Sequence, residues 1–463
     1  MINLENVIEQ LPVFDTFCSV DKLNALVEEC QADERFIIDA PGTSGQGEPI
    51  YHVQFGKGAT TVLIVAGPHA DEPIGSLTVF SLLTLLKNSN EELLKQDIEW
   101  HIVPCIDPDG ARLNEGWTQQ AFTHENYMKH FHKQAYKDQA DFSFPMNYKG
   151  LVFDQPTPEA QVLMKVLDRA KPDFYSTTHN GYMGGCYFVG SEDFGQPVYQ
   201  AFNQLLEKYN LPLRASNHSE GITTGYAPGF FELPLIDVNY GYFKQFGIDW
   251  GLWDLGGQMS YDYLKEIKPS AVAFYSEPAY GYHPDILSEK ETDIPLRQLA
   301  LRLDADSKFN KTVILEEWNK VKDDVDKTSP FYKKSKHYIL KAQDHLQDFL
   351  PDFIFRTVKS LLFDSMYEGM VTERVRFTHC MLSFGFLCND YEFVRLLKAS
   401  DQTPAIKASI KRLEPLFDKA LADIDKQIDL SLYKVSDVND LLKVQLGSWL
   451  IVLNTLLDKA KDQ

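Results

Sequence analysis

The sequence has 463 residues, too many for one small hydrophobic core, so we expect two or three domains. Hydrophobic residues make up 44% and charged residues 24% of the chain, as in ordinary soluble globular proteins. The formal net charge of -21 argues against non-specific nucleic-acid binding, which needs clustered Lys and Arg, so we expect no nucleic-acid partner.

The cysteines and the N-terminus indicate a compartment. The six cysteines contain no CxxC pair, and several lie in apolar patterns, so free buried thiols and a reducing environment are expected. The first residues lack the basic region and apolar core of a signal peptide. No apolar run approaches the roughly 20 residues of a membrane helix. We therefore expect a cytoplasmic protein with no membrane partner.

Upstream of about residue 300, short apolar runs alternate with helical stretches and Gly/Pro-rich loops, which is typical of α/β proteins. We predict strands over 60–66, 98–105, 173–178 and 271–276. Each is too apolar for a solvated face, so they suit the centre of a sheet covered by helices. Helices are predicted over 73–86 and 158–170, the second with Thr157 as its N-cap.

The long segment between His179 and Glu277 is rich in Gly and aromatic residues. It fits loops that enclose a substrate, or equally a structural insertion packed on the sheet. Downstream of about 305 the pattern is helical, and Pro415 is expected to break one of its helices. The predicted domains are therefore 1–305 and 306–463, the second an all-α bundle that serves packing or a homo-oligomer.

Metal-binding residue types follow the predicted strands. His69 and Glu72 stand three residues apart after the first, His179 follows 173–178, and Glu277 ends the fourth. Asp109 lies in a Pro-Asp-Gly turn after 98–105, where its role is turn chemistry or the orientation of a ligand histidine. Open α/β sheets place ligand crevices at such strand ends. Two histidines and a glutamate would bind one zinc and leave a position for water, with another carboxylate as base.

A single His-x-x-Glu is weak evidence, and its position after a buried strand strengthens it. A second cluster, His124, His130 and His132, stands among Lys, Gln and Asn. That polar setting predicts a loop or helix face, not a second metal site.

The motifs His69-Ala-Asp-Glu72, Asp107-Pro-Asp-Gly110, His179 and Glu277 occur in the order shown by the zinc carboxypeptidases of the carboxypeptidase A/B superfamily, which the chain resembles over roughly 1–300. The stretch from Gly42 to Ile50 also resembles that family's G-x-S-x-x-G-x-P-I segment. The resemblance implies an α/β/α fold with a mixed, twisted eight-stranded sheet. A single zinc would lie at the carboxyl-terminal edge of that sheet.

Carried over, the resemblance implies that His69, Glu72 and His179 bind zinc, one per chain. Glu277 would take a proton from the zinc-bound water, which attacks an amide carbonyl, and return it to the leaving amine. Arg112, the only arginine between Arg35 and Arg169, is the candidate for polarising the carbonyl.

The sequence departs from the family where substrate is bound. The segment that carries an arginine for the substrate's terminal carboxylate corresponds to 143–148, where that arginine is absent and only Asn147 is a candidate for substrate binding. The family's specificity tyrosine is also missing from its usual place, and Tyr261, Tyr263 or Tyr280 are the substitutes considered.

The leading expectation is a zinc hydrolase of carboxypeptidase type that acts on a peptide. An amidase or deacylase acting on a small or cell-wall-derived amide is the alternative within the enzyme class. A non-catalytic zinc-binding scaffold is the third, and the retention of Glu277 argues against it.

Overall fold

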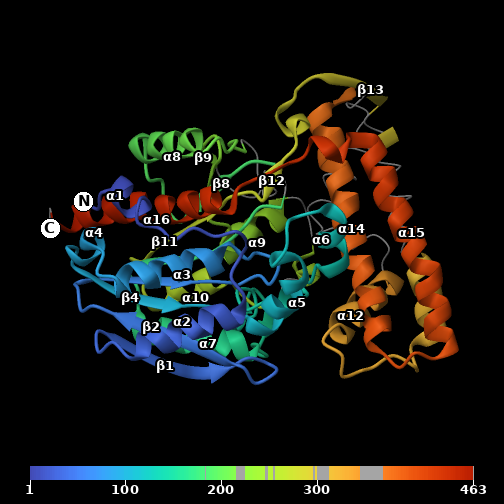
Figure 1. Cartoon of the computed structure of the whole chain (residues 1–463), viewed down its shortest axis with the longest axis horizontal. Coiled ribbons are helices and arrows are strands. Elements are labelled where there is room, and N and C mark those ends of the chain that lie inside the picture. Colours follow the sequence, from blue (N-terminus) through green and yellow to red (C-terminus); the bar gives the residue numbers. More distant parts are fainter. Residues whose placement is uncertain are drawn as a thin grey trace. The chain divides into compact units, whose positions relative to one another are not determined.

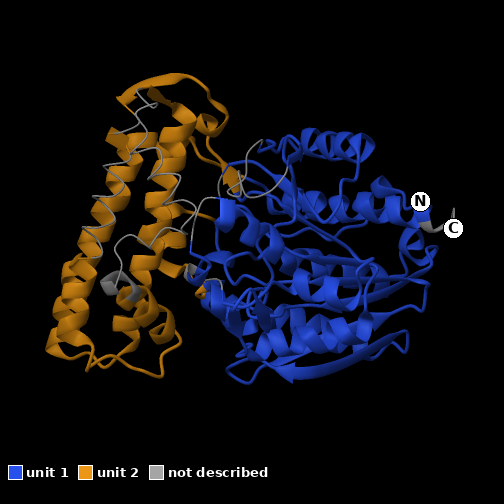
Figure 2. Cartoon of the chain, turned by 180° about the vertical axis from the view of Figure 1, so that it is seen from behind, with its two compact units in different colours: residues 1–121, 136–280, 436–463 blue, residues 122–135, 281–435 orange. Residues whose placement is uncertain are grey.

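The computed structural model describes residues 1–182, 184–214, 225–245, 249–253, 256–295, 298–299, 312–344 and 369–461. The chain forms two compact units, coloured separately in Figure 2. Unit 1 comprises residues 1–121, 136–280 and 436–463, and unit 2 comprises residues 122–135 and 281–435. This division differs from the predicted domains 1–305 and 306–463, because a helical pattern alone does not show on which core a helix packs.

Unit 1 is built on a nine-stranded mixed sheet with the order β1-β2-β4-β3-β7-β11-β8-β10-β9. Its strands are β1 (Phe36–Thr43), β2 (Pro49–Phe55), β3 (Thr60–Val65), β4 (Ile98–Val103), β7 (Phe174–Thr177), β8 (Tyr187–Gly190), β9 (Gly225–Ala227), β10 (Phe230–Glu232) and β11 (Val272–Glu277). A separate hairpin pairs β5 (Met146–Tyr148) with β6 (Leu151–Phe153). The four strands predicted from apolar runs are β3, β4, β7 and β11, and they adjoin in the middle of the sheet.

The helices of unit 1 cover both faces of this sheet (Figure 1). They are α1 (Leu4–Ile8), α2 (Val20–Gln31), α3 (Ile74–Lys87), α4 (Glu91–Leu94), α5 (Pro108–Thr118), α7 (Pro158–Ala170), α8 (Gln196–Lys208), α9 (Ile236–Gln245), α10 (Ser260–Ile267) and α16 (Val438–Lys461), with short 3-10 turns at Tyr136–Asp138 and Trp250–Leu252. Thr157 caps α7 as predicted, its side chain accepting a hydrogen bond from the backbone of Ala160.

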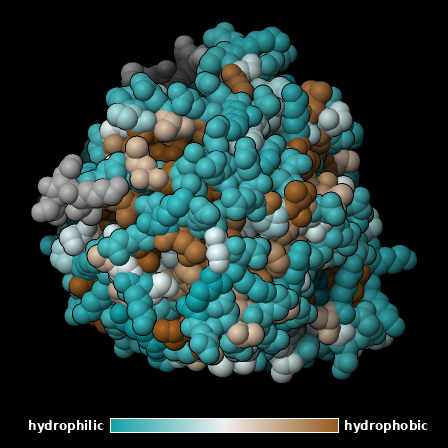
Figure 3. All heavy atoms as spheres, turned by 60° about the vertical axis from the view of Figure 1, so that its left-hand side comes forward, coloured by the Kyte–Doolittle hydropathy of each residue, from teal (hydrophilic) through white to brown (hydrophobic). Residues whose placement is uncertain are grey.

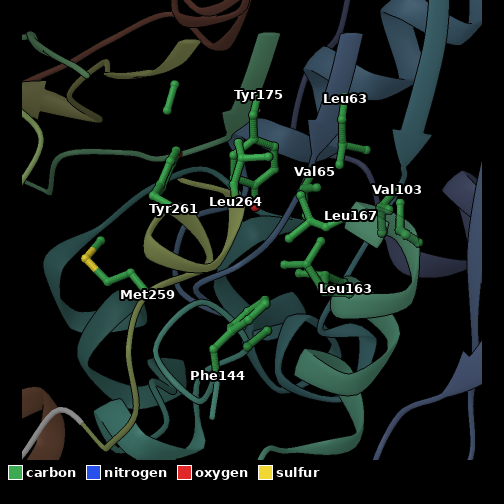
Figure 4. Close-up of a cluster of buried hydrophobic side chains, with 14 of the residues drawn as sticks. Leu63, Val65, Val103, Phe144, Leu163, Leu167, Tyr175, Met259, Tyr261 and Leu264 are labelled. Atoms are coloured by element: carbon green, nitrogen blue, oxygen red, sulfur yellow. The ribbon is translucent and has the colours of Figure 1, made fainter. Parts of the chain in front are cut away.

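Successive side chains of a strand point to opposite faces of the sheet, so each residue can be assigned to one face. On one face, Leu63, Val65 and Tyr175 meet Leu163 and Leu167 of α7, with Leu264 of α10 in the same buried cluster (Figure 4). On the other, Phe274 stacks against Phe202 of α8, and Ser276 accepts a hydrogen bond from Ser448 of α16. The odd-numbered residues of β11, ending in Glu277, therefore belong to the α7 and α10 face.

Helix α16 belongs to unit 1, whereas the sequence pattern assigned it to the predicted helical domain 306–463. By length and composition, its segment Val438–Lys459 is apolar enough to cross a membrane, contrary to the expectation of no such run, and 67% of its most apolar window is buried. It packs on α3, α8 and β11, and Trp449 and Leu453 are 2% and 1% exposed. Its apolar surface thus faces the core of unit 1. Elsewhere, the face drawn in Figure 3 is mostly hydrophilic, with hydrophobic residues in small groups.

Unit 2 is mainly helical. It contains α6 (His124–His130), α12 (Tyr332–Asp344), α14 (Glu373–Ala399) and α15 (Pro404–Ile428), the two-stranded pairs β12 (Gly281–Tyr282) with β15 (Lys434–Val435) and β13 (Glu291–Pro295) with β14 (Met370–Thr372), and 3-10 turns at Pro284–Leu287 and Leu430–Leu432. Helices α14 and α15 pack along each other, joined by a hydrogen bond of 3.0 Å from Tyr391 to Glu414. Pro415 lies inside α15, so the predicted break there is wrong. A single proline removes one backbone hydrogen bond, and the burial of Leu413 and Phe417 keeps the helix continuous.

Candidate metal centre

Strand direction gathers the candidate residues at one edge. Strands β4, β3, β7 and β11 run parallel to one another, so their carboxyl ends lie at the same edge of the sheet. His69 and Glu72 stand in the turn between β3 and α3, His179 follows β7, and Glu277 is the last residue of β11. The chain thus delivers all four side chains to a single region, as predicted.

The turn that carries His69 and Glu72 depends on a close approach of its backbone to Thr178. Gly67 has φ +67°, a left-handed conformation that glycine adopts without strain, and its N–H donates to Thr178 Oγ1 at 3.3 Å. Gly75, in the first turn of α3, could not carry a Cβ, which would lie 2.2 Å from Thr178 Oγ1. Two small residues therefore let the helix start directly against the end of β7.

The side chains of His69, Glu72 and His179 converge. His69 Nδ1 lies 2.9 Å from Glu72 Oε1, and His179 Nδ1 lies 2.9 Å from Glu72 Oε2. One ligand atom from each lies within 4.8 Å of the others. The three residues are 9%, 7% and 3% exposed, so water competes little for them. Among the described residues this is the one His/Cys/Asp/Glu group close enough to hold a metal ion.

This donor set fits zinc. Two imidazole nitrogens and one carboxylate are the protein ligands of a catalytic zinc site, which keeps one further position for water or substrate. With Nδ1 as ligand, His179 carries its proton on Nε2, which faces Thr177 Oγ1 at 2.7 Å. The ring of His69 is held by stacking on Phe142, with 5.5 Å between ring centroids.

The charges around His179 favour a cation at the triad. Burial alone would lower the pKa of His179, but the hydrogen bond and the charge of Glu72 raise it above its ordinary value, with further contributions from Glu277 and Asp141. Glu277 is therefore close enough to His179 to affect it electrostatically. In the sheet Glu277 pairs with Tyr187 of β8, so both side chains project from the same face.

The sequence matches the model of the zinc carboxypeptidase family over residues 24–268, slightly more than half of the chain. The chain belongs to the zinc carboxypeptidase family. Members of this family are zinc-dependent hydrolases of the metallopeptidase type. The match ends before β11, so it includes the three candidate zinc ligands but not Glu277.

Solved structures of metallopeptidases resemble the chain weakly. A candidate metallopeptidase of Shewanella amazonensis has 17% identity, covers 56% of this chain and 84% of that one, and has a TM-score of 0.37. Carboxypeptidase A of Helicoverpa armigera has 14% identity, coverage of 60% and 69%, and a TM-score of 0.37. A metallo-carboxypeptidase of Burkholderia cenocepacia has 15% identity, covers 57% of this chain and 60% of that one, and has a TM-score of 0.31. No curated protein matches the chain. Membership therefore follows from the family model alone.

Arg112, the candidate for polarising the carbonyl, is engaged in ion pairs. Its guanidinium forms ion pairs with Glu48 and, at 2.7 Å, with Asp21, which raise its pKa further. No contact among the described residues joins Arg112 to the zinc triad. The structure thus supports the alternative role of a structural ion pair, which links α5 to α2 and the start of β2.

Asn147 is exposed on the β5–β6 hairpin, where it pairs with Val152, and the described contacts do not bring it to the triad. The candidate tyrosines have structural partners. Tyr261 is fully buried and shares a hydrogen bond with Thr177, Tyr263 donates to Asp168 at 2.7 Å, and Tyr280 donates to the carbonyl of Asp71 at 2.6 Å.

The remaining polar candidates also have structural partners. Asp109 accepts hydrogen bonds from Ser44 and the backbone of Gln46, so it secures the Gly42–Ile50 loop and not a ligand histidine. His132 pairs with Glu392 at 3.0 Å inside unit 2, and His130 contacts the carbonyl of Asn126. The group of described residues that could hold a metal ion does not include His124, His130 or His132.

Sequence reasoning missed the residues that support the triad. Asn180 accepts a hydrogen bond from the N–H of Ile74 at 2.7 Å and donates to the carbonyl of Pro278 at 3.0 Å. It therefore ties the start of α3 to the residue after Glu277. The adjacency of Asn180 to His179 was the available signal, but the two partners are separated from it by 106 and 98 positions.

Proposed function

We propose that this protein hydrolyses an amide bond near the carboxyl end of a peptide, with zinc held by His69, Glu72 and His179. The observation that carries the proposal is the convergence of these side chains at the sheet edge where β11 ends in Glu277. When bound, zinc would lower the pKa of a water molecule and polarise the substrate carbonyl.

The chain's own residues supply the remaining steps. Glu277 accepts a proton from the attacking water and returns it to the leaving amine, as a positioned general base and acid. One carboxylate oxygen of Glu72 contacts His69 and the other contacts His179, so Glu72 fixes the spacing of the triad. Thr177 holds the outer nitrogen of His179 and thereby orients the imidazole. Phe142 stacks on the ring of His69 and so helps to hold it in place.

The second candidate is an amidase or deacylase that acts on a small amide. The segment 143–148 favours it, because this segment contains no arginine to bind a peptide's terminal carboxylate. We also propose a cytoplasmic location, in agreement with six free cysteines, and a homo-oligomer as the assembly to test.

The experiment compares zinc-loaded wild type with Glu277→Gln on N-acylated dipeptides, using Glu266→Gln as a matched control because Glu266 is exposed on α10. Loss of general-base catalysis should lower kcat about 10²- to 10⁴-fold in Glu277→Gln while zinc content is unchanged. The control should behave as wild type. Full activity in Glu277→Gln, or no hydrolysis of any dipeptide or small amide by wild type containing one zinc, would overturn the proposal.

A further inference from the structure

Tyr280 is the last residue of unit 1 before the chain enters unit 2 at Gly281. It follows Glu277 closely in the sequence, and it is buried, with 3% exposure. Its ring makes edge contacts with Phe17 and Trp117, at centroid distances of 6.0 Å and 5.4 Å. The chain thus passes from the candidate general base to unit 2 through a side chain that the core of unit 1 holds in place.

The hydroxyl of Tyr280 reaches the turn that carries two of the candidate zinc ligands. It donates to the carbonyl of Asp71 at 2.6 Å, and Asp71 directly precedes Glu72. The same turn is closed by the N–H of Glu72, which donates to the carbonyl of His69 at 3.1 Å. Because these bonds fix the main chain of the turn, they also fix the directions from which His69 and Glu72 approach a metal.

The amide of Tyr280 is bound to the segment that follows His179. Its N–H donates to the carbonyl of Gly181 at 2.9 Å, and the N–H of Gly181 donates to the carbonyl of Pro278 at 3.1 Å. A parallel bridge joins Gly181 to Ala279. Tyr280 therefore binds the main chain next to all three candidate ligands, through its hydroxyl on one side and its amide on the other.

The carbonyl of Tyr280 is bound where the chain returns from unit 2. Ser436 is the first residue after that return, and its N–H donates to the Tyr280 carbonyl at 2.7 Å. The hydroxyl of Ser436 donates to the carbonyl of Ala279 at 3.0 Å. The adjoining pair is Gly281 with Val435, in β12 and β15. The segments that enter and leave unit 2 are therefore hydrogen-bonded to each other, and they meet at Tyr280.

We propose that Tyr280 is a positioning residue that couples zinc binding to the pairing of the segments that enter and leave unit 2. The inference rests on the proposed function through its zinc site alone. The hydroxyl, amide and carbonyl of Tyr280 bind three separate segments, so an opening at one of them loosens the others. Coupling is reciprocal: what holds Tyr280 in place raises the affinity for zinc, and bound zinc stabilises the bonds around Tyr280 by the same factor.

The first test measures the zinc dissociation constant by competition with a chromophoric chelator. Tyr280→Phe keeps the ring but removes the bond to Asp71, so the dissociation constant should rise about 10-fold, as when other groups that orient metal ligands are lost. Tyr199→Phe is the matched control, because Tyr199 is also 3% exposed and its hydroxyl also donates at 2.6 Å, to Asp193. A merely structural tyrosine would lower the stability of both variants and leave both zinc affinities unchanged, which would refute the proposal.

Hydrogen exchange of the full-length chain measures the coupling in the other direction. With zinc a hundredfold above its dissociation constant, the amides of Tyr280 and Ser436 should exchange at least about 10-fold more slowly in wild type than without zinc. At the same saturation this zinc effect should be largely lost in Tyr280→Phe and kept in Tyr199→Phe. No zinc effect in wild type, or an equal effect in Tyr280→Phe, would contradict the coupling.

A change at the return from unit 2 separates coupling from local support of the turn. Ser436→Ala removes the bond to the Ala279 carbonyl and leaves the Tyr280 hydroxyl and every candidate ligand in place. The zinc dissociation constant should rise about 2- to 5-fold, the worth of part of one hydrogen bond. Ser431→Ala is the control, because Ser431 is exposed and bonds to Asp429. Unchanged zinc affinity in Ser436→Ala would confine the role of Tyr280 to the turn and overturn the inference.

These measurements use zinc alone, so their outcome is distinguishable from that of the proposed function. If the zinc and exchange effects are present but wild type hydrolyses no amide, the hydrolase is refuted and the coupling stands. If wild type hydrolyses amides but neither effect is present, the coupling is refuted and the hydrolase stands. Wild type that takes up no zinc would refute both.

Discussion

His179 Nε2 lies 2.7 Å from the hydroxyl oxygen of Thr177, two residues earlier on the same strand end. Thr177 also shares a hydrogen bond with the hydroxyl of Tyr261, and the N–H of Thr177 donates to that hydroxyl at 3.2 Å. All three residues are buried. The hydroxyls of Thr177 and Tyr261 therefore form a hydrogen-bonded relay at Nε2 of His179. This relay orients the ring so that Nδ1 faces Glu72.

Removing that relay should weaken metal binding. Thr177→Val keeps the shape of the side chain but leaves His179 Nε2 without its partner, so the zinc dissociation constant should rise about 10- to 100-fold. Competition with a chromophoric chelator measures it. Thr177→Ser retains the hydroxyl and is the matched control. Zinc binding as tight in Thr177→Val as in wild type would show that the relay does not orient the ligand.

Gly75→Ala should destabilise unit 1. The added Cβ would lie 2.2 Å from Thr178 Oγ1 and 2.8 Å from Ala66 Cβ, so α3 must shift away from β7. Such overpacking costs about 1–3 kcal/mol of the free energy of unfolding, measured by urea denaturation. Gly241→Ala is the control, because nothing lies within 4 Å of its Cβ position on α9. Equal stability of the two variants would contradict the close packing of α3.

The stability of unit 1 should fall in mild acid because of a buried histidine pair. His52 Nε2 lies 2.9 Å from His101 Nδ1, and its other nitrogen faces Asp39 and Arg169. Burial and then the neighbouring His101 lower the pKa of His52 to about 4, against the opposing pull of Asp39. The pKa of His101 is also lowered, by burial.

Because the folded-state pKa of His52 lies below its ordinary value of 6.5, the unfolded chain binds more protons between these two values. The stability is complete above pH 6.5 and declines as the pH falls toward 4, by an amount on the order of 3 kcal/mol for this histidine. Denaturant unfolding across this range measures the slope. His52→Gln should flatten it, and an unchanged slope would refute the assignment to His52.

Arg112→Gln should leave catalysis almost intact. Arg112 is paired with Glu48 and Asp21 and its side chain is 32% exposed, so its loss should cost no more than about 1 kcal/mol of stability. Initial-rate kinetics should give kcat within about twofold of wild type. A fall in kcat of two orders of magnitude would instead restore Arg112 as the group that polarises the carbonyl.

The sequence predicted those features of the molecule that depend on residues close together in the chain. The four apolar strands, the capped helix after Thr157 and the positions of His69, Glu72, His179 and Glu277 at strand ends all follow from nearby residues. The strand order could not be predicted, because it depends on pairings between distant segments, such as that of Val62 with Phe174. The placement of α16 failed for a related reason: its apolar face specifies burial but not which core.

Site residues divide in the same way. The ligands are recognisable because metal chemistry restricts residue type and spacing. The orienting residues are not, because Thr177 and Asn180 are common polar residues whose roles depend on partners far along the chain. Arg112 was chosen by its place in the sequence, and the ion pairs that engage it come from Asp21 and Glu48, which the linear pattern did not connect to it.

The most direct measurement is the zinc content of purified wild type, His69→Ala and His130→Ala. His69 belongs to the converging triad, whereas His130 lies in unit 2, where its imidazole contacts the carbonyl of Asn126. One zinc per chain in wild type and His130→Ala, lost in His69→Ala, is the result expected. Wild type that takes up no zinc when it is supplied, or His69→Ala that retains it, would contradict the assignment of the metal centre.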